Sequence, residues 1–495
     1  MTLRIVAVAL TLAPSALFAQ HYQADFPAED LRARHAQVFD QIGTDAVAVL
    51  QGVHQTEGFT FPRQHNSFYY LSGVETPGAY LLLDGRSRHV TIYLPRRNAR
   101  LEAAEGRVLA ADDVELVKKV SGADDVQPIE SMAVAGWPLA AGTAGAAGAG
   151  AGRGGQGAAV LAIFAEFSPA ENSGQSRGEL VSSETARVND SWDGGVSRQR
   201  RFVELLRARN ARADVRNLNP ILDEMRSIKS PREIALIRRA SQIAGLGMME
   251  AMRSTEAGVT EYQLDAAARY IFLVNDARLE GYRSITATGT NNINNMHYFR
   301  NSSTLEDGNL VLMDYAPDYR YYTSDIGRVW PVNGKYNAWQ RELLQFILEY
   351  RNAVLARIKP GLTTRQIMDD AKQAMEPVFA RTRFSKPIYE KAARTLVETG
   401  GGVFSHTVGL AVHDVGRYAG GPLKPGQVFS VDPQLWVREE NLYLRYEDVG
   451  VVTDTGFENF TDFLPSELAA MEKLVQARGI LQTTPAVPES AMKKK

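Results

Sequence analysis

The sequence lacks cysteine altogether and has only eight histidines among its 495 residues. The absence of cysteine excludes disulfides, thiolate zinc sites and cysteine nucleophiles. Any bound metal ion must therefore use nitrogen or oxygen ligands. A strong net charge is missing as well, because 55 basic residues nearly balance 57 acidic ones. This balance does not indicate nucleic acid or an anionic membrane as the main partner, and it favours a small or neutral substrate.

Long hydrophobic runs are also missing beyond the N-terminus, so no membrane span is expected in the rest of the chain. The N-terminus has an early Arg4, an apolar run over residues 5–13 and small residues ending at Ala19. This order is typical of a cleavable signal peptide, which we place at residues 1–19. The protein is then expected in the periplasm or outside the cell. The alternative is an uncleaved anchor.

The chain is long enough for at least two domains. The first is predicted over residues 20–218 as a mixed α/β domain. Its strand candidates are short apolar runs separated by Gly and Pro, with a hairpin at "DGRSRH"; they are "DAVAVLQG", "SFYYLSG", "AYLLLDG" and "HVTIYLP". The segments "LRARHAQVFDQIG" and "RQRRFVELLRAR" predict flanking helices.

Residues 140–159 read "AAGTAGAAGAGAGRGGQGAA" and have almost no side chain to bury. Such a segment cannot offset the entropy of ordering it, so we expect a flexible surface insertion. A glycine-rich phosphate loop is the alternative. It is disfavoured because the segment has no Gly-Lys-Ser/Thr ending and no defined helix start.

The second domain is predicted over residues 219–480, with a disordered tail over 481–495. The segment "SPREIALIRRASQIA" predicts a helix with a capping box at Ser230 and Glu233. Two similar helix starts follow, "GVTEYQ" at 258–263 and "GLTTRQ" at 361–366. Their recurrence indicates a duplicated α/β domain, although chance recurrence of a good capping sequence would look the same.

Two aspartates stand in "NLVLMDYAPDYRYYTSDIGRVW", which predicts a hairpin with its turn around Pro317 to Arg320. If Asp314 and Asp325 are directly opposed across this hairpin, their like charges repel. A buried pair of this kind needs either a proton or a cation, and a divalent metal ion is the natural partner. The alternative is that one of them is solvated at the end of the turn.

Further ligand candidates lie downstream. Asp432 and Glu447 stand at the ends of apolar runs, where charges are unexpected, and "FSHTVGLAVHD" holds His406 and His413. Arg445 shares a strand face with Glu447, a pattern that is also typical of a surface ion pair. Four carboxylates and one imidazole on or beside the strands of one domain suit two divalent ions of the Mn, Co or Zn type. The five ligand candidates are Asp314, Asp325, His406, Asp432 and Glu447.

In their order and spacing these residues resemble the aminopeptidase P and prolidase branch of the pita-bread metallopeptidases. The resemblance rests on Asp314 and Asp325 eleven residues apart, the block from Ser405 to Asp414, Pro433 after an acidic residue, and Arg445-x-Glu447-Asp448. It covers nearly the whole mature chain. It implies an α/β fold with a creatinase-like N-terminal domain and a C-terminal duplicated pita-bread catalytic domain. His297, which stands 17 residues before Asp314, matches the family's substrate-side histidine.

The resemblance also implies roles for these residues. Asp314 would bind one metal ion, Asp325 and Glu447 would bridge both, and His406 with Asp432 would complete the second. A hydroxide between the ions would be the nucleophile. His297 and His413 would contact the scissile carbonyl and the tetrahedral intermediate, and Arg445 would brace the bridging carboxylate. The list of expected catalytic residues is therefore His297, His413 and Arg445.

Two positions depart from the family pattern. Asp432 stands where the family has Glu, and its carboxylate is withdrawn by roughly 1.5 Å. Gly402 stands where the family often has a histidine, four residues before His406. The shorter side chain would weaken the second metal site or move a proton acceptor away from the hydroxide.

The expected function is hydrolysis of the N-terminal Xaa-Pro bond of peptides by an exported dinuclear metallopeptidase, with Mn as the preferred metal and a possible homo-oligomeric state. One alternative is a pita-bread module that has lost catalysis and binds peptides or protein tails. Another is a metal-free creatinase-like hydrolase, which would have no need of the carboxylates. Retention of all five ligand candidates favours the metalloenzyme.

Overall fold

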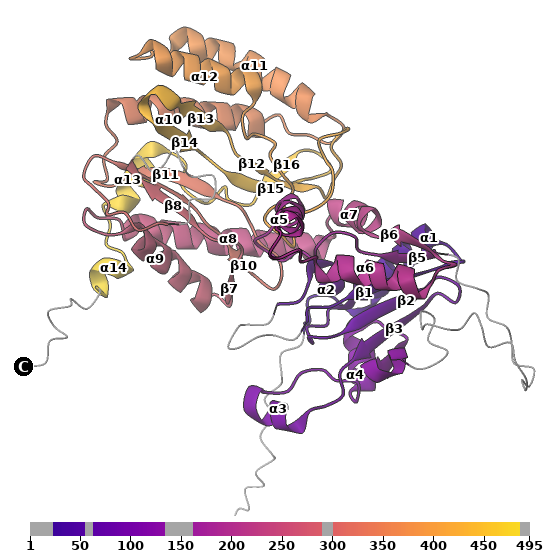
Figure 1. Cartoon of the computed structure of the whole chain (residues 1–495). Helices are drawn as coiled ribbons and strands as arrows, with labels where there is room; N and C mark the ends of the chain where they lie inside the picture. The colour runs from indigo at the N-terminus through magenta and orange to yellow at the C-terminus, as the bar shows by residue number, and fades with distance from the viewer. Residues whose placement is uncertain (1–22, 55–62, 134–161, 290–299, 486–495) are drawn as a thin grey trace, which may run out of the picture.

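The computed structural model describes residues 23–54, 63–133, 162–289 and 300–485. The predicted signal peptide, the Gly/Ala-rich insertion and His297 lie outside these residues. In Figure 1 the first half of the chain forms one body, coloured indigo to magenta. The second half forms another, coloured from pink through orange to yellow. Among the described residues, none of the helices has the length and apolar character needed to cross a membrane.

A six-stranded mixed sheet lies at the centre of the first half, in the order β4-β3-β2-β1-β5-β6. Alternate residues of β1 pack into two different cores, Ala46 and Ala48 on one face and Val47 and Val49 on the other. The sheet is therefore covered on both faces. Its strands are β1 (Ala46–Gln51), β2 (Tyr80–Asp84), β3 (His89–Leu94), β4 (Asp125–Pro128), β5 (Ala162–Ala165) and β6 (Asp214–Asn217). The hairpin expected at "DGRSRH" joins β2 and β3.

Helices surround this sheet, including both that the sequence predicted here. They are α1 (Ala28–Ile42), α2 (Asn66–Ser72), α3 (Ala99–Glu105), α4 (Val114–Ser121), α5 (Arg177–Asn189), α6 (Arg198–Arg209) and α7 (Asn219–Ser227). The strand predicted at "SFYYLSG" is wrong, because this segment is α2. All seven of its residues are buried, and a continuous apolar run does not separate a buried helix from a strand. Gly73, with φ +62°, ends the helix in the left-handed conformation.

The strands of the second half lie between two groups of helices, α10 to α12 on one side and α8 with α9 on the other (Figure 1). The helices are α8 (Pro231–Arg253), α9 (Glu261–Val274), α10 (Ala338–Leu355), α11 (Thr364–Arg381), α12 (Pro387–Thr399), α13 (Leu468–Val475) and α14 (Ile480–Thr483). The strands are β7 (Leu279–Glu280), β8 (Ile285–Thr288), β9 (Leu310–Asp314), β10 (Pro317–Asp318), β11 (Gly327–Pro331), β12 (Val428–Val431), β13 (Gln434–Val437), β14 (Leu442–Arg445), β15 (Asp448–Val452) and β16 (Phe457–Asn459).

The three predicted capping boxes are present, at Ser230 of α8, Thr260 of α9 and Thr363 of α11. The glycine before each of the two similar starts has a positive φ, +93° at Gly258 and +84° at Gly361. The disordered tail predicted over 481–495 is wrong for residues 481–483, which belong to α14, and residues 486–495 lie outside the described part of the chain. In α14, Gln482 donates to the carbonyl oxygen of Ser254, at the end of α8.

Candidate metal centre

Three carboxylates meet where the sheets of the second half join. Asp314 ends β9, Asp325 lies two residues before β11, and Glu447 lies between β14 and β15. A β-bridge between Gly327 and Glu447 connects β11 to the segment that carries Glu447. One carboxylate oxygen from each of the three acids lies within 4.8 Å of the other two. These three residues are 2 to 4% exposed, so their charges are almost fully removed from solvent.

The expected direct opposition of Asp314 and Asp325 is wrong. Strands β9 and β11 are antiparallel neighbours, but Asp314 pairs with Gly327, two residues beyond Asp325. The connection between the strands is not a simple turn, because β10 pairs with β7 and a bridge joins Tyr319 to Tyr322. The two carboxylates nevertheless converge, since Asp325 folds back toward the end of β9.

His406 approaches this cluster from a loop attached to β12. A bridge between Thr407 and Phe429 fixes the loop, and the carbonyl oxygen of Thr407 lies 3.2 Å from His406 Nδ1. The Nε2 atom of His406 lies 3.2 Å from Asp325 Oδ2. A proton kept on Nδ1 would leave Nε2 free to bind a metal ion in place of this contact. The ring of His413 stands edge-on to that of His406, with centroids 4.2 Å apart. Both imidazoles thus lie beside Asp325.

Asp432 joins the cluster through Arg445. It follows β12 directly, and its Oδ2 lies 3.4 Å from Arg445 Nη1. The same guanidinium contacts Asp314 and lies 3.1 Å from Glu447 Oε2. One cation therefore touches three of the predicted ligands. The structure brings together all the predicted site residues that it describes.

The electrostatics of the cluster favour bound cations. Burial, together with the charge of Asp325, raises the pKa of Glu447 to about 8. Burial and the neighbouring Glu447 raise the pKa of Asp432 well above its usual value. Burial alone would lower the pKa of His406, but the hydrogen bond and charge of Asp325 outweigh it and raise that pKa.

Unused acceptor atoms point to the same conclusion. Asp325 Oδ1 and Asp432 Oδ1 are buried and accept no hydrogen bond from the described residues. Leaving a buried anionic oxygen without a partner is costly. Oxygen-rich donors with one imidazole are the chemistry that divalent ions of the manganese type take. The residues present therefore fit a metal centre.

Two supports of the cluster were not predicted from the sequence. The hydroxyl of Tyr282 donates to Asp314 Oδ1 at 2.5 Å. Asp448, next to Glu447, accepts from Arg328 at 2.7 Å and from Arg351 at 2.5 Å, all of them buried. No local pattern marks Tyr282. The Glu447-Asp448 pair was visible in the sequence, but its two arginines were not.

The first half of the chain also reaches the loop that carries His413. Asp414 is contacted by Arg226, and Lys229 Nζ lies 3.4 Å from its Oδ2. Arg226 in turn lies 3.1 Å from Glu171. The amide of Val412 donates to the carbonyl oxygen of Ser173 at 2.8 Å. The loop that carries His413 is therefore in contact with segments that precede α8 in the chain.

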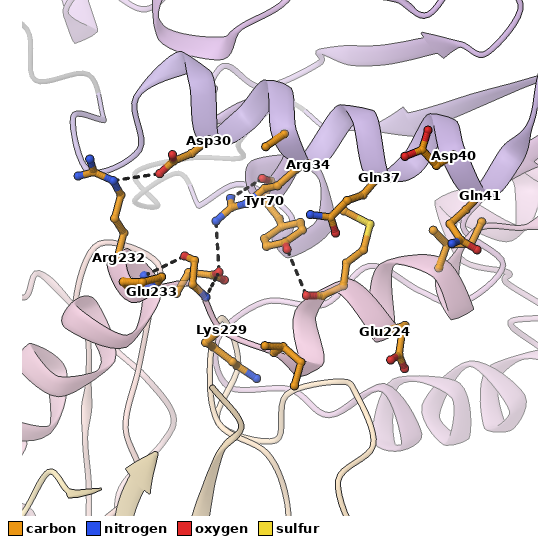
Figure 2. A pocket seen from close by; sticks show the side chains of 16 residues that line it. Asp30, Arg34, Gln37, Asp40, Gln41, Tyr70, Glu224, Lys229, Arg232 and Glu233 are labelled. Carbon is orange, nitrogen blue, oxygen red and sulfur yellow. Dashed lines mark hydrogen bonds and ion pairs between the residues drawn. The ribbon is translucent and has the colours of Figure 1, made fainter. Parts of the chain in front are cut away.

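A hollow of about 900 Å³ lies apart from the cluster, between α1 and the start of α8. Figure 2 shows Arg34 of α1 pointing to Glu233, and Arg232 pointing to Asp30. None of the clustered acids or histidines lines this hollow. Its ion pairs connect α1 with the start of α8, and Lys229 on its wall is the residue that pairs with Asp414.

Comparison with known families and structures agrees with this arrangement. Residues 235–454 match metallopeptidase family M24, and residues 31–136 match the aminopeptidase P N-terminal domain. The chain is 29% identical over 476 residues to a Haemophilus influenzae protein named Xaa-Pro aminopeptidase, covering 92% of this chain and 99% of that protein. It is 33% identical over 274 residues to the Escherichia coli protein of the same name, covering 52% of this chain and 61% of that one.

Among solved structures, proline aminopeptidase P II from Yersinia pestis superimposes with a TM-score of 0.70 at 25% identity, covering 91% of this chain and 99% of that one. These matches confirm the predicted fold class, a creatinase-like N-terminal domain followed by a pita-bread domain. The chain therefore carries a metallopeptidase family M24 domain preceded by an aminopeptidase P N-terminal domain.

Proposed function

We propose that this protein is an aminopeptidase that hydrolyses the N-terminal Xaa-Pro bond of peptides. The observation that carries the proposal is the convergence of Asp314, Asp325 and Glu447 with His406 in a buried cluster that has unused acceptor atoms. The names of the similar proteins supply the substrate class, a peptide with proline at its second position.

The same cluster supports a dinuclear site. Its proposed ligands are the five residues predicted from the sequence, Asp314, Asp325, His406, Asp432 and Glu447. Four carboxylates provide enough oxygen atoms for two divalent ions, and this donor set favours manganese over cobalt or zinc. Bound there, the ions would lower the pKa of water and supply a nucleophile near neutral pH.

The remaining side chains of the site would contact the substrate or hold the metal ligands in place. His413, whose ring stands edge-on to that of His406, would donate a proton or hydrogen bond to a peptide carbonyl beside the cluster. We assign the same task to His297. Arg445 holds three carboxylates in place through its contacts with Asp314, Asp432 and Glu447. We also propose that the protein is exported. An exported chain whose measured mass shows that it begins at Gln20 would support this.

Metal analysis and peptide hydrolysis test the function together. Metal-stripped protein should cleave an Xaa-Pro tripeptide only after Mn²⁺ is added, and it should leave the matching Xaa-Ala peptide largely intact. The variant Asp325→Ala should fold but lose both metal and activity, because it removes a ligand from the centre of the cluster. A folded wild type that binds no metal and cleaves no Xaa-Pro peptide would contradict the proposal and favour a peptide-binding module.

A further inference from the structure

Gln434 lies against the metal cluster but is not among its proposed ligands. Its side-chain Nε2 donates to Asp432 Oδ2 at 2.5 Å. The residue begins β13, and its backbone amide donates to the carbonyl oxygen of Gly401 at 3.0 Å. The strand and this backbone hydrogen bond therefore fix the backbone of Gln434, from which its side chain extends to Asp432.

The pairing of β13 with β14 places a second donor on the same oxygen. Gln434 lies directly opposite Arg445 in this pair. Arg445 Nη1 is 3.4 Å from Asp432 Oδ2, the atom that Gln434 contacts. The other oxygen, Oδ1, is buried and accepts no hydrogen bond from the described residues. Two neighbouring strands thus hold one oxygen of Asp432 and leave the other available.

Gly402 provides the space for this arrangement. Its φ of +76° is in the left-handed region that favours glycine. A Cβ atom at this position would collide with the carbonyl oxygen of Asp432 and would lie 2.7 Å from Cδ of Gln434. Any side chain at residue 402 would therefore displace Gln434 or the backbone of Asp432.

We propose that Gln434 is a positioning residue of the metal centre, which fixes Asp432 Oδ2 together with Arg445 and so presents Oδ1 to a divalent cation. Asp432 has one methylene fewer than glutamate, so its shorter reach makes orientation matter more. Residues that hydrogen-bond a metal ligand from behind typically change metal affinity by about 10- to 100-fold when they are lost. This inference rests on the proposed function, because it concerns the same cluster.

Calorimetric titration of Mn²⁺ into metal-stripped protein tests the role of Gln434. The variant Gln434→Met fills a similar volume beside Gly402 but cannot donate, so the weaker-bound Mn²⁺ should lose about tenfold or more in affinity. Gln434→Ala should lose at least as much. An unchanged affinity in folded Gln434→Met would overturn the proposal.

A double-mutant cycle shows whether Gln434 acts through Asp432. In an Asp432→Ala background, Gln434→Met should cause no further loss of affinity, whereas a full additional loss would overturn the proposal. Gln427→Ala is the matched control, since this buried glutamine accepts from the amide of Lys424 at 2.9 Å, away from the cluster. It should leave Mn²⁺ affinity unchanged, and an equal loss there would mean that Gln434 has only a general structural role.

The readout also separates this inference from the proposed function. Wild type that binds Mn²⁺ but cleaves no Xaa-Pro peptide would contradict the peptidase assignment and leave the role of Gln434 to be decided by the affinities alone. Wild type that binds no Mn²⁺ would overturn the positioning role. Normal hydrolysis with unchanged affinity in Gln434→Met would contradict the positioning role only.

Discussion

At the scale of single residues, Asp432 and Gly402 are the two departures from the family pattern, and in the structure they lie against each other. The sequence predicted Asp432 as a ligand because a charge is unexpected at the end of an apolar run. It also predicted a weakened site, because the side chain of Asp432 is one methylene shorter than that of glutamate, and no sequence pattern indicated the contact with Gln434. Gln434 donates to Asp432 and occupies space that a side chain at residue 402 would need, which supports the view that the two departures compensate for one another.

The raised pKa values in the cluster predict that metal binding depends on pH. Glu447, with a pKa of about 8, is protonated at neutral pH when no cation is bound. A metal ion must displace that proton, so affinity should rise about tenfold per pH unit up to about pH 8 and then level off. Asp432 and His406 also hold protons more tightly than usual, which adds to the effect in the same direction.

Mn²⁺ titrations at several pH values, in buffers of different ionisation enthalpy, measure this proton release. At about pH 7 we expect at least one proton released for each protein molecule that fills with metal. Equal affinity between about pH 6 and pH 8, with no buffer dependence of the heat, would contradict the prediction.

At the scale of elements, the accuracy of prediction followed the range of the interactions involved. Capping boxes at Thr260 and Thr363 were predictable because each needs only four consecutive residues. The offset of Asp325 from Asp314 was not, because it depends on β10 pairing with the distant β7. The helix at "SFYYLSG" was missed for a different reason, since its burial on all sides removes the periodicity that identifies a helix.

At the start of β15, the substitution Asp448→Asn should strongly lower the free energy of unfolding. Asp448 is fully buried between Arg328 and Arg351, whose charges hold the pKa of its carboxyl well below the usual range. Because this pKa is lowered in the folded protein, the stabilisation is present at neutral pH and is lost only in acid, below about pH 4. Removing the charge leaves two buried guanidinium groups without a counter-ion, so the free energy of unfolding should fall by about 3–5 kcal/mol.

Denaturant unfolding at neutral pH measures this loss. Glu458→Gln on β16 is the matched control, because its ion pair with Arg238 is about one third to two fifths exposed. The control should change the free energy of unfolding by less than about 1 kcal/mol. Equal losses in the two variants would show that the buried ion pairs of Asp448 contribute no more to the free energy of unfolding than an exposed pair does.

At the scale of the whole molecule, the two halves of the chain meet at the loop that carries His413. Arg226 bridges Glu171 and Asp414, which stand 55 and 188 residues from it in the sequence. Contacts over such separations cannot be inferred from local patterns. The two domains themselves were predicted, because each has its own sequence patterns. The first half is thus structurally connected to the active site, and α1 is fastened to the start of α8 by Arg34 and Glu233 (Figure 2).

This connection predicts a specific outcome for Asp414→Asn. The change removes the charge that pairs with Arg226 and Lys229, so the loop carrying His413 loses its anchor to the first half. Because displacement of a catalytic group by about 1 Å can cost on the order of a hundredfold in rate, kcat for an Xaa-Pro peptide should fall strongly. Mn²⁺ affinity should fall less than kcat, since Asp314, Asp325 and Glu447 lie on other segments and the loop at His406 is also held by the Thr407–Phe429 bridge.

Steady-state kinetics and Mn²⁺ calorimetry on the folded variant separate these effects. Asp40→Asn is the control, because its ion pair with Arg88 is more than half exposed on α1 and far from the loop in sequence. It should leave both kcat and affinity unchanged. If Asp414→Asn lowers Mn²⁺ affinity as much as kcat, the contacts of Asp414 with Arg226 and Lys229 support the metal ligands rather than His413. If kcat is unchanged, the contacts between the halves contribute to stability alone, and the position of His413 is fixed within the catalytic half.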